Sequence, residues 1–156
     1  MAGSNFLKKL FWWDPFHPKN FLTTEQSQQI REKIKEIESQ AHTKIVIQVI
    51  RDHRGNLYDR AVKEFSRHKL FDKETKTGIL LLISLKQRQF QILGDEHIHE
   101  KLGDDGWKKL ADKLSEFFKE GKYFEGISWL LEELAEHLRI HFPKKSALEE
   151  NREKQS

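Results

Sequence analysis

Two strongly apolar, β-branched runs constrain this chain more than any other feature. The first is Ile45–Ile50 and the second is Gly78–Ile83. Each is almost continuous in hydrophobic residues, which is typical of strands buried on both faces of a sheet. Between them, residues 58–65 carry apolar side chains at helical spacing. Two strands joined through a helix form a parallel pair with a right-handed crossover, so the sequence predicts a β-α-β unit whose second strand is central.

A third strand is predicted directly after the second run. Phe90 and Ile92 alternate with glutamines, as in a strand that has one face in water. Only a short polar break at Lys86-Gln87 separates this segment from the second run. The two segments are therefore expected to pair as an antiparallel hairpin, which gives a small mixed sheet.

Amphipathic helices are predicted on either side of these strands. Thr23 has the spacing of a capping box and begins the first helix. Asp104 or Asp105 is expected to cap a later helix, which leaves the stretch from Asp95 as a loop. The last helix stops before Pro143. The order α-β-α-β-β-α-α predicts an α/β fold, a three-layer α/β/α sandwich.

Composition excludes several classes of protein. Lys and Arg number 28 against 25 Asp and Glu, with the signs interspersed, so no basic stripe marks a nucleic-acid binder. The absence of cysteine excludes disulfides, thiol catalysis and Cys-ligated zinc, and it fits a reducing cytoplasm. The apolar run Leu10–Trp13 is too short for a secretory signal, and Ile79–Ile83 is too short to span a bilayer. We therefore expect a cytoplasmic protein.

The chain divides into an aromatic arm (1–22), an α/β domain (23–143) and a polar tail (144–156) that is expected to be disordered. The arm carries more large apolar side chains than a protein leaves in water. It either packs on the domain's own core, binds a partner protein, or contacts an anionic membrane surface through its lysines and aromatic rings. The candidate interaction residues are Phe6, Phe11, Trp12 and Trp13.

Acidic residues are predicted to gather at one edge of the sheet. The third strand runs back, so its end at Asp95 falls at the same edge as the loop that contains Asp72 and Glu74. Hard cations bind where several carboxylate oxygens converge, which predicts a weak Ca²⁺ or Mg²⁺ site. The alternative is that these residues cap a helix and face solvent. The candidate metal ligands are Asp72, Asp95, Glu96, Glu100, Asp104 and Asp105.

Catalytic motifs do not support any enzyme class. Ser84 lacks the Gly-x-Ser-x-Gly context of a nucleophile elbow, and neither a phosphate-binding loop nor a dinucleotide fingerprint occurs. His97 and His99 have no third nitrogen ligand nearby in the sequence, which disfavours zinc. No catalytic or cofactor-binding residue is therefore assigned.

Several unusual blocks occur in a recognisable order. They are the stretches 77–83, 90–95 and 98–103, then Trp107, then Phe-Lys-Glu-Gly-Lys-Tyr at 118–123. In this pattern the chain resembles the TPM domain family, also called the TPM phosphatase family. It looks most like the short bacterial members with an Ile-Gly-Asp-x-Gly-Ile-His-Glu-Lys block. The resemblance extends over about residues 22 to 143.

The resemblance implies an α/β/α sandwich and leaves the reaction open. Plant relatives have been connected with photosystem maintenance and acid phosphatase activity, and some bacterial relatives with divalent-cation binding. Short bacterial members often occur beside LemA-type membrane proteins, which suggests such a partner. This chain has Lys76-Thr77 where many members have Asp-Asn, His97 where many have Gly, and Lys44 where Glu is common. The loss of acidic groups argues against metal-dependent chemistry.

Two classes of function follow from these features. The first is an accessory or interaction module, tuned by a divalent cation. The second is a weak metal-dependent phosphomonoester hydrolase, in which a cation held by the acidic loop would polarise a phosphoryl oxygen. The first is favoured because likeness of fold alone does not determine function.

Overall fold

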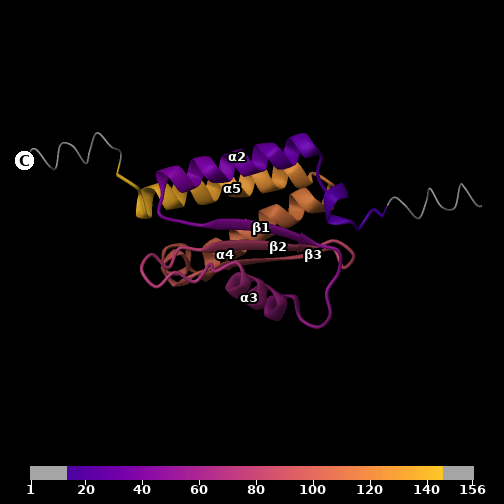
Figure 1. The fold of residues 1–156 in the computed structure, drawn as a ribbon, viewed down its shortest axis with the longest axis horizontal. Helices are drawn as coiled ribbons and strands as arrows, with labels where there is room; N and C mark the ends of the chain where they lie inside the picture. Colours follow the sequence, from indigo (N-terminus) through magenta and orange to yellow (C-terminus); the bar gives the residue numbers. More distant parts are fainter. Residues whose placement is uncertain (1–13, 146–156) are drawn as a thin grey trace, which may run out of the picture.

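A three-stranded sheet lies at the centre of the molecule in a computed structural model, which describes residues 14–145 (Figure 1). The strand order is β1-β2-β3, with β1 parallel and β3 antiparallel to β2. The predicted β-α-β unit and hairpin are both confirmed. The strands are β1 (Ile45–Ile50), β2 (Ile79–Ser84) and β3 (Gln89–Gly94).

Helices cover both faces of this sheet. The helix α3 lies on one face, and α2, α4 and α5 lie on the other, so the predicted three-layer sandwich is confirmed (Figure 1). Among residues 14–145, no helix has the length and hydrophobicity needed to cross a lipid bilayer. The helices are η1 (Pro18–Asn20), α2 (Thr24–Gln40), α3 (Leu57–Arg67), α4 (Glu96–Lys119) and α5 (Tyr123–His141).

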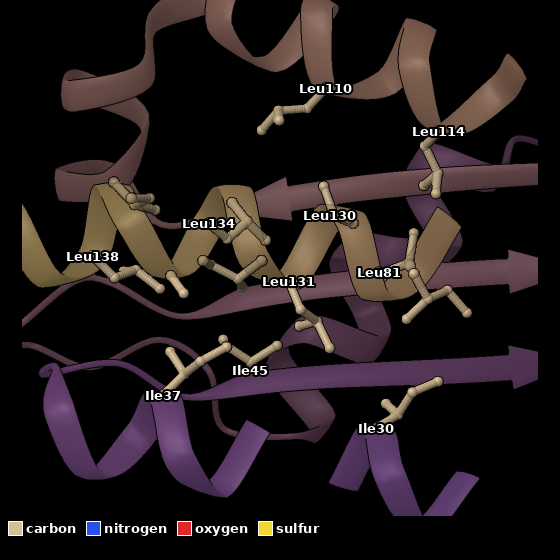
Figure 2. Close-up of a cluster of buried hydrophobic side chains, with 14 of the residues drawn as sticks. Ile30, Ile37, Ile45, Leu81, Leu110, Leu114, Leu130, Leu131, Leu134 and Leu138 are labelled. Atoms are coloured by element: carbon tan, nitrogen blue, oxygen red, sulfur yellow. The ribbon is translucent and has the colours of Figure 1, made fainter. Parts of the chain in front are cut away.

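The strand β2 divides the hydrophobic core into two clusters. Successive side chains of a strand point to opposite faces of the sheet. Leu81 and its neighbours two positions away therefore join α2, α4 and α5, whereas Leu80 and Leu82 join α3. Figure 2 shows the larger cluster, in which Leu130, Leu131, Leu134 and Leu138 of α5 lie among side chains from α2, α4 and the sheet.

Local chemistry explains where the helices begin. The predicted capping box at α2 is confirmed, because Thr23 Oγ1 accepts from the Gln26 amide at 3.0 Å and Gln26 Oε1 accepts from the Thr23 amide at 3.1 Å. The Asn56 side chain caps α3 by accepting from the Tyr58 amide at 2.7 Å. These bonds satisfy amides that have no partner inside a helix.

The predicted loop from Asp95 to Asp105 is wrong. Asp95 is the N-cap of α4, and its carboxylate accepts from the Glu96 amide at 2.8 Å. The helical path breaks only at Gly103, which has φ +67°, a value that glycine adopts without strain. The sequence Gly103-Asp104-Asp105-Gly106 is typical of a loop or a helix start. It therefore leads to the prediction of a loop for the helical turns that come before Gly103.

The predicted burial of the first strand on both faces is also wrong in part. Only Ile45 of β1 is buried, and the rest of the strand is half-buried. The reason is position, since β1 pairs only with β2 and lies at the edge of the sheet. The second strand has a neighbour on each side, and all of its residues are buried as predicted.

Replacing Gly94 with Ala should destabilise the fold, because its backbone closely approaches α4. An added Cβ would lie 2.4 Å from the Trp107 ring and 2.8 Å from a methyl group of Ile98. We expect a loss of about 1–3 kcal/mol in the free energy of unfolding, measured by urea denaturation. Gly106→Ala is the control, because its Cβ would meet nothing closer than 3.3 Å, and it should leave stability unchanged or raise it. Equal midpoints for the two variants would contradict this packing.

Candidate functional site

The loop before β2 and the first turn of α4 meet at one end of the sheet, hereafter the acidic end (residues 72–78 and 95–104). Their backbones are joined by two hydrogen bonds, Asp95 N–H to Gly78 O at 2.9 Å and His97 N–H to Lys76 O at 3.0 Å. His97 Nδ1 lies 2.8 Å from Thr75 O. The predicted proximity of these two segments is therefore confirmed.

The predicted metal ligands at this end are engaged in local hydrogen bonds. Asp72 Oδ1 accepts from the Glu74 amide at 2.8 Å and from the Thr75 amide at 3.4 Å, and these bonds lower the pKa of Asp72. The Asp95 carboxylate is occupied with the cap of α4. Each of these two acids thus uses one carboxylate oxygen to fix the local backbone conformation.

A lysine occupies the centre of the acidic end. Lys76 Nζ lies 3.0 Å from Glu96 Oε2, and Asp95 and Glu100 are near enough to act on the same charge. The hydrogen bond and charge of Glu96 raise the pKa of Lys76, and Lys76 in turn lowers the pKa of Glu96. Both side chains are partly exposed, so the pair contributes little to stability by itself.

The remaining predicted ligands lie on the outer surface of α4. Trp107 Nε1–H donates to His99 Nδ1 at 3.0 Å, and His99 Nε2 lies 3.6 Å from an Asp104 oxygen. Glu100 and Asp105 are exposed. Within residues 14–145, no three or more His, Asp or Glu side chains are grouped as a metal site would require. The Ca²⁺ or Mg²⁺ site stays a prediction from the sequence.

A groove of about 710 Å³ lies at the opposite end, beside the carboxyl end of β2 and the start of β3. Ligands of open α/β sheets commonly bind outside this edge. Adjacent rings in the groove are 4.8 Å apart for Phe21 and Tyr123, and 5.4 Å apart for Phe90 and Phe118. We call it the aromatic groove after the rings that line it, which are Phe16, Phe21, Phe90, Phe118 and Tyr123.

A buried hydroxyl fixes the wall of the aromatic groove. Ser84 is fully buried at the end of β2, 2.7 Å from His53 Nδ1, and it donates to Gln87 Oε1 at 2.8 Å. Gln87 Nε2 donates in turn to His53 O at 3.3 Å. This triangle ties the hairpin after β2 to the loop after β1.

Ser84 is not arranged as an activated nucleophile, because it is fully buried and its hydroxyl donates to Gln87. Its proton is directed to Gln87, so the network assigns His53 Nδ1–H as a donor to the Ser84 oxygen. A general base would instead accept the hydroxyl proton. The serine and histidine are therefore positioned to support the turn.

The chain enters the domain beside the aromatic groove. Arg51 follows β1 directly, and its Nε–H donates to Asp14 Oδ2 at 2.9 Å. This hydrogen bond lowers the pKa of Asp14. Pro15 and Phe16 then form part of the groove wall. The candidate interaction residues of the arm, Phe6, Phe11, Trp12 and Trp13, lie outside the described residues.

Comparison with known proteins identifies the family. The model of the TPM domain family matches residues 16–137, which is most of the chain. The chain belongs to the TPM domain family. No functionally curated protein sequence matches it.

Solved structures agree with the family assignment. The BA42 protein of the psychrophilic bacterium Bizionia argentinensis superposes with a TM-score of 0.75 at 25% identity, covering 83% of this chain and 90% of that one. The N-terminal domain of a P. gingivalis protein gives a TM-score of 0.66 at 18% identity, covering 83% and 85%. The second likeness shows the fold alone.

Sequence reasoning missed the aromatic groove of this TPM domain. Phe90 continues the alternation of the third strand and Phe118 the apolar face of the helix after Asp105, so the sequence gives these rings no role beyond their own elements. Tyr123 stands out only as part of the block at 118–123. Nothing in the sequence indicates that these rings meet at the end of the sheet. The only local signal for a groove is the Phe-rich segment before Thr23, which falls within the predicted arm.

Replacing Ser84 with Ala should test the triangle of hydrogen bonds. The variant removes the buried hydroxyl that joins half-buried His53 to exposed Gln87, and water can reach these two partners in part, so it should cost about 0.5–1.5 kcal/mol of unfolding free energy. Ser115→Ala is the matched control, because Ser115 also lines the groove but its hydroxyl makes no hydrogen bond among residues 14–145. Chemical denaturation should separate the two variants. Equal denaturation midpoints for the two variants would show that the hydrogen bonds of the triangle do not stabilise the fold.

Proposed function

We propose that this TPM domain is an accessory module that binds a segment of a partner protein in the aromatic groove. The observation that carries the proposal is the collection of rings at the carboxyl end of the sheet. Aromatic side chains are enriched at protein interfaces because they bury a large area with few rotatable bonds. Tyr123 is 39% exposed, so part of this aromatic surface is available to a partner.

The charges around the aromatic groove indicate the chemistry of the partner. Arg88 and Lys119 line it, and neither has a carboxylate partner among residues 14–145. The acid that also lines it, Glu120, is already paired with Lys122 at 3.0 Å. The groove thus presents an apolar floor with net positive charge, which suits a segment with apolar anchors and acidic neighbours.

The chain's own arm is a poorer occupant than such a segment. The arm has suitable aromatic residues, and it begins beside the groove wall at Pro15. However, it contains Lys8 and Lys9 and no acidic residue before Asp14, so its charge has the same sign as that of the groove. We propose that the arm serves a second contact, with a LemA-type membrane protein as the candidate partner and a membrane surface as the less favoured alternative.

A cytoplasmic location is part of the same proposal. The lack of cysteine is compatible with a reducing compartment. A segment with acidic and apolar residues would reach the aromatic groove there from a soluble protein or from the cytoplasmic part of a membrane protein.

The alternative function is a weak metal-dependent phosphomonoester hydrolase, with Ca²⁺ or Mg²⁺ held at the acidic end. In this case Lys76 or Lys101 would offset phosphate charge, and Asp95 would help to hold the cation. The present bonds of Asp95 and Lys76 favour the interaction module. We expect no turnover of a generic phosphomonoester with either cation. Turnover that is lost in Asp95→Asn would support the hydrolase.

Binding to the groove can be tested with two short synthetic peptides. One has Leu and Trp anchors among Glu residues, and the other has Lys in place of each Glu. We expect the acidic peptide to bind the full chain, with amide shifts around Phe90 and Phe118, and at least about tenfold more tightly than the basic peptide. Arg88→Glu combined with Lys119→Glu should lower the affinity for the acidic peptide by about tenfold or more.

Lys63→Glu combined with Lys109→Glu is the matched control for this test. It makes the same change in net charge at exposed lysines that do not line the groove, and it should leave affinity nearly unchanged. A full chain carrying Trp12→Ser and Trp13→Ser tests the arm. If the amide signals of the groove residues shift in this variant without any peptide, the arm and not a partner segment occupies the groove. Failure of both peptides to bind would contradict the proposed function.

A further inference from the structure

The position of Lys76 is fixed by the backbone around it. Its amide donates to Asp72 O at 3.2 Å and its carbonyl accepts from the His97 amide at 3.0 Å. The next residue, Thr77, is fully buried and donates through its hydroxyl to His42 O, while Thr43 Oγ1 donates to Thr77 O at 2.9 Å. The lysine therefore projects from a segment that is anchored on both sides.

This anchoring places one positive charge among three carboxylates. Glu96 Oε2 is 3.0 Å from the ammonium, and the charges of Asp95 and Glu100 act on it as well. These are three of the predicted cation ligands. An ammonium at this distance uses the Glu96 oxygen and repels a divalent ion that approaches the others.

We propose that the Lys76 ammonium is the resident counter-ion of the acidic end and takes the place that Ca²⁺ or Mg²⁺ would otherwise take. The junction between the 72–78 loop and α4 then closes without a metal. Relatives connected with divalent-cation binding imply a metal, but the residues of this chain do not fit one. A hard cation needs six to eight oxygens that converge. Among residues 14–145 no three His, Asp or Glu side chains are grouped as a metal site requires. One oxygen each of Asp72 and Asp95 accepts from a backbone amide, and one oxygen of Glu96 pairs with the lysine.

The backbone at Lys76 makes the proposal testable by substitution. Lys76 has φ +51°, in the left-handed region that Asp and Asn tolerate better than most residues. Lys76→Asp should therefore keep the loop conformation, remove the ammonium from Glu96 and add a carboxylate to the same loop position. Lys76→Asn removes the charge alone and fits the same conformation, so it serves if the Asp variant fails to fold.

The experiment is an amide-shift titration of the full chain with Ca²⁺ and, separately, with Mg²⁺. For the native chain we expect no saturable shifts at residues 72–78 or 95–100 up to about 1 mM cation, the weak end of protein calcium sites. Lys76→Asp should acquire saturable shifts there. The dissociation constant for the cation should be at least about tenfold lower than any measured for the native chain. Its melting temperature should rise with cation and fall with a chelator. Lys76→Asn should show a smaller gain in the same direction.

Lys73→Asp is the matched control for Lys76→Asp. It makes the same change in the same loop, at an exposed lysine with no ion-pair partner among residues 14–145. An equal gain in Lys73→Asp would overturn the proposal, because net charge and not the position of the ammonium would then govern binding. Saturable submillimolar binding by the native chain at this junction would overturn it directly, as would the absence of any gain in both Lys76 variants.

Discussion

The burial of β2 on both faces is the constraint on which the rest of the structure depends. Its hydrophobic side chains, Ile79 to Ile83, are at most 4% exposed. Burying one such side chain stabilises the folded state by about 1.5–3 kcal/mol. Covering both faces needs helices on each side, and satisfying both backbone edges needs a strand on each side. The three layers and the central position of β2 follow from these two requirements.

The direction of the strands gives the two ends of the sheet different environments. At the acidic end, the loop that enters β2 meets the turn that leaves β3, and their polar groups bond to one another. At the other end, the carboxyl ends of β1 and β2 meet the hairpin and the chain that enters at Asp14. The first end pairs Lys76 with Glu96 and uses Asp72 and Asp95 to accept from backbone amides. The second gathers partly buried rings beside two cations, Arg88 and Lys119, that have no carboxylate partner among residues 14–145. This pairing of apolar and basic groups supports the proposed binding surface at the aromatic groove.

The sequence predicts the fold well because its strongest signals are local. The two β-branched runs, the capping box at Thr23 and the glutamine alternation around Phe90 each define an element without knowledge of its neighbours. The errors arise where tertiary position decides. The edge position of β1 and the helical turn after Asp95 depend on what packs beside them. Sequence order placed the loop with Asp72 and Lys76 at the same end as Asp95 correctly, but it could not show that Lys76 pairs with Glu96.

The helix α4 connects the two ends of the sheet. Its first turn is bonded to the loop around Lys76, and its last turns supply Phe118 and Lys119 to the aromatic groove. Between them, the break at Gly103 redirects the helix, and Trp107 packs against Gly94 of β3. The contacts at the acidic end thus set where α4 begins, and the helix carries that placement to the groove. A charge supplied by a lysine is always present, whereas a bound cation varies with its concentration. If Lys76 is the resident counter-ion, as proposed, the junction that begins α4 closes in the same way at any concentration of metal.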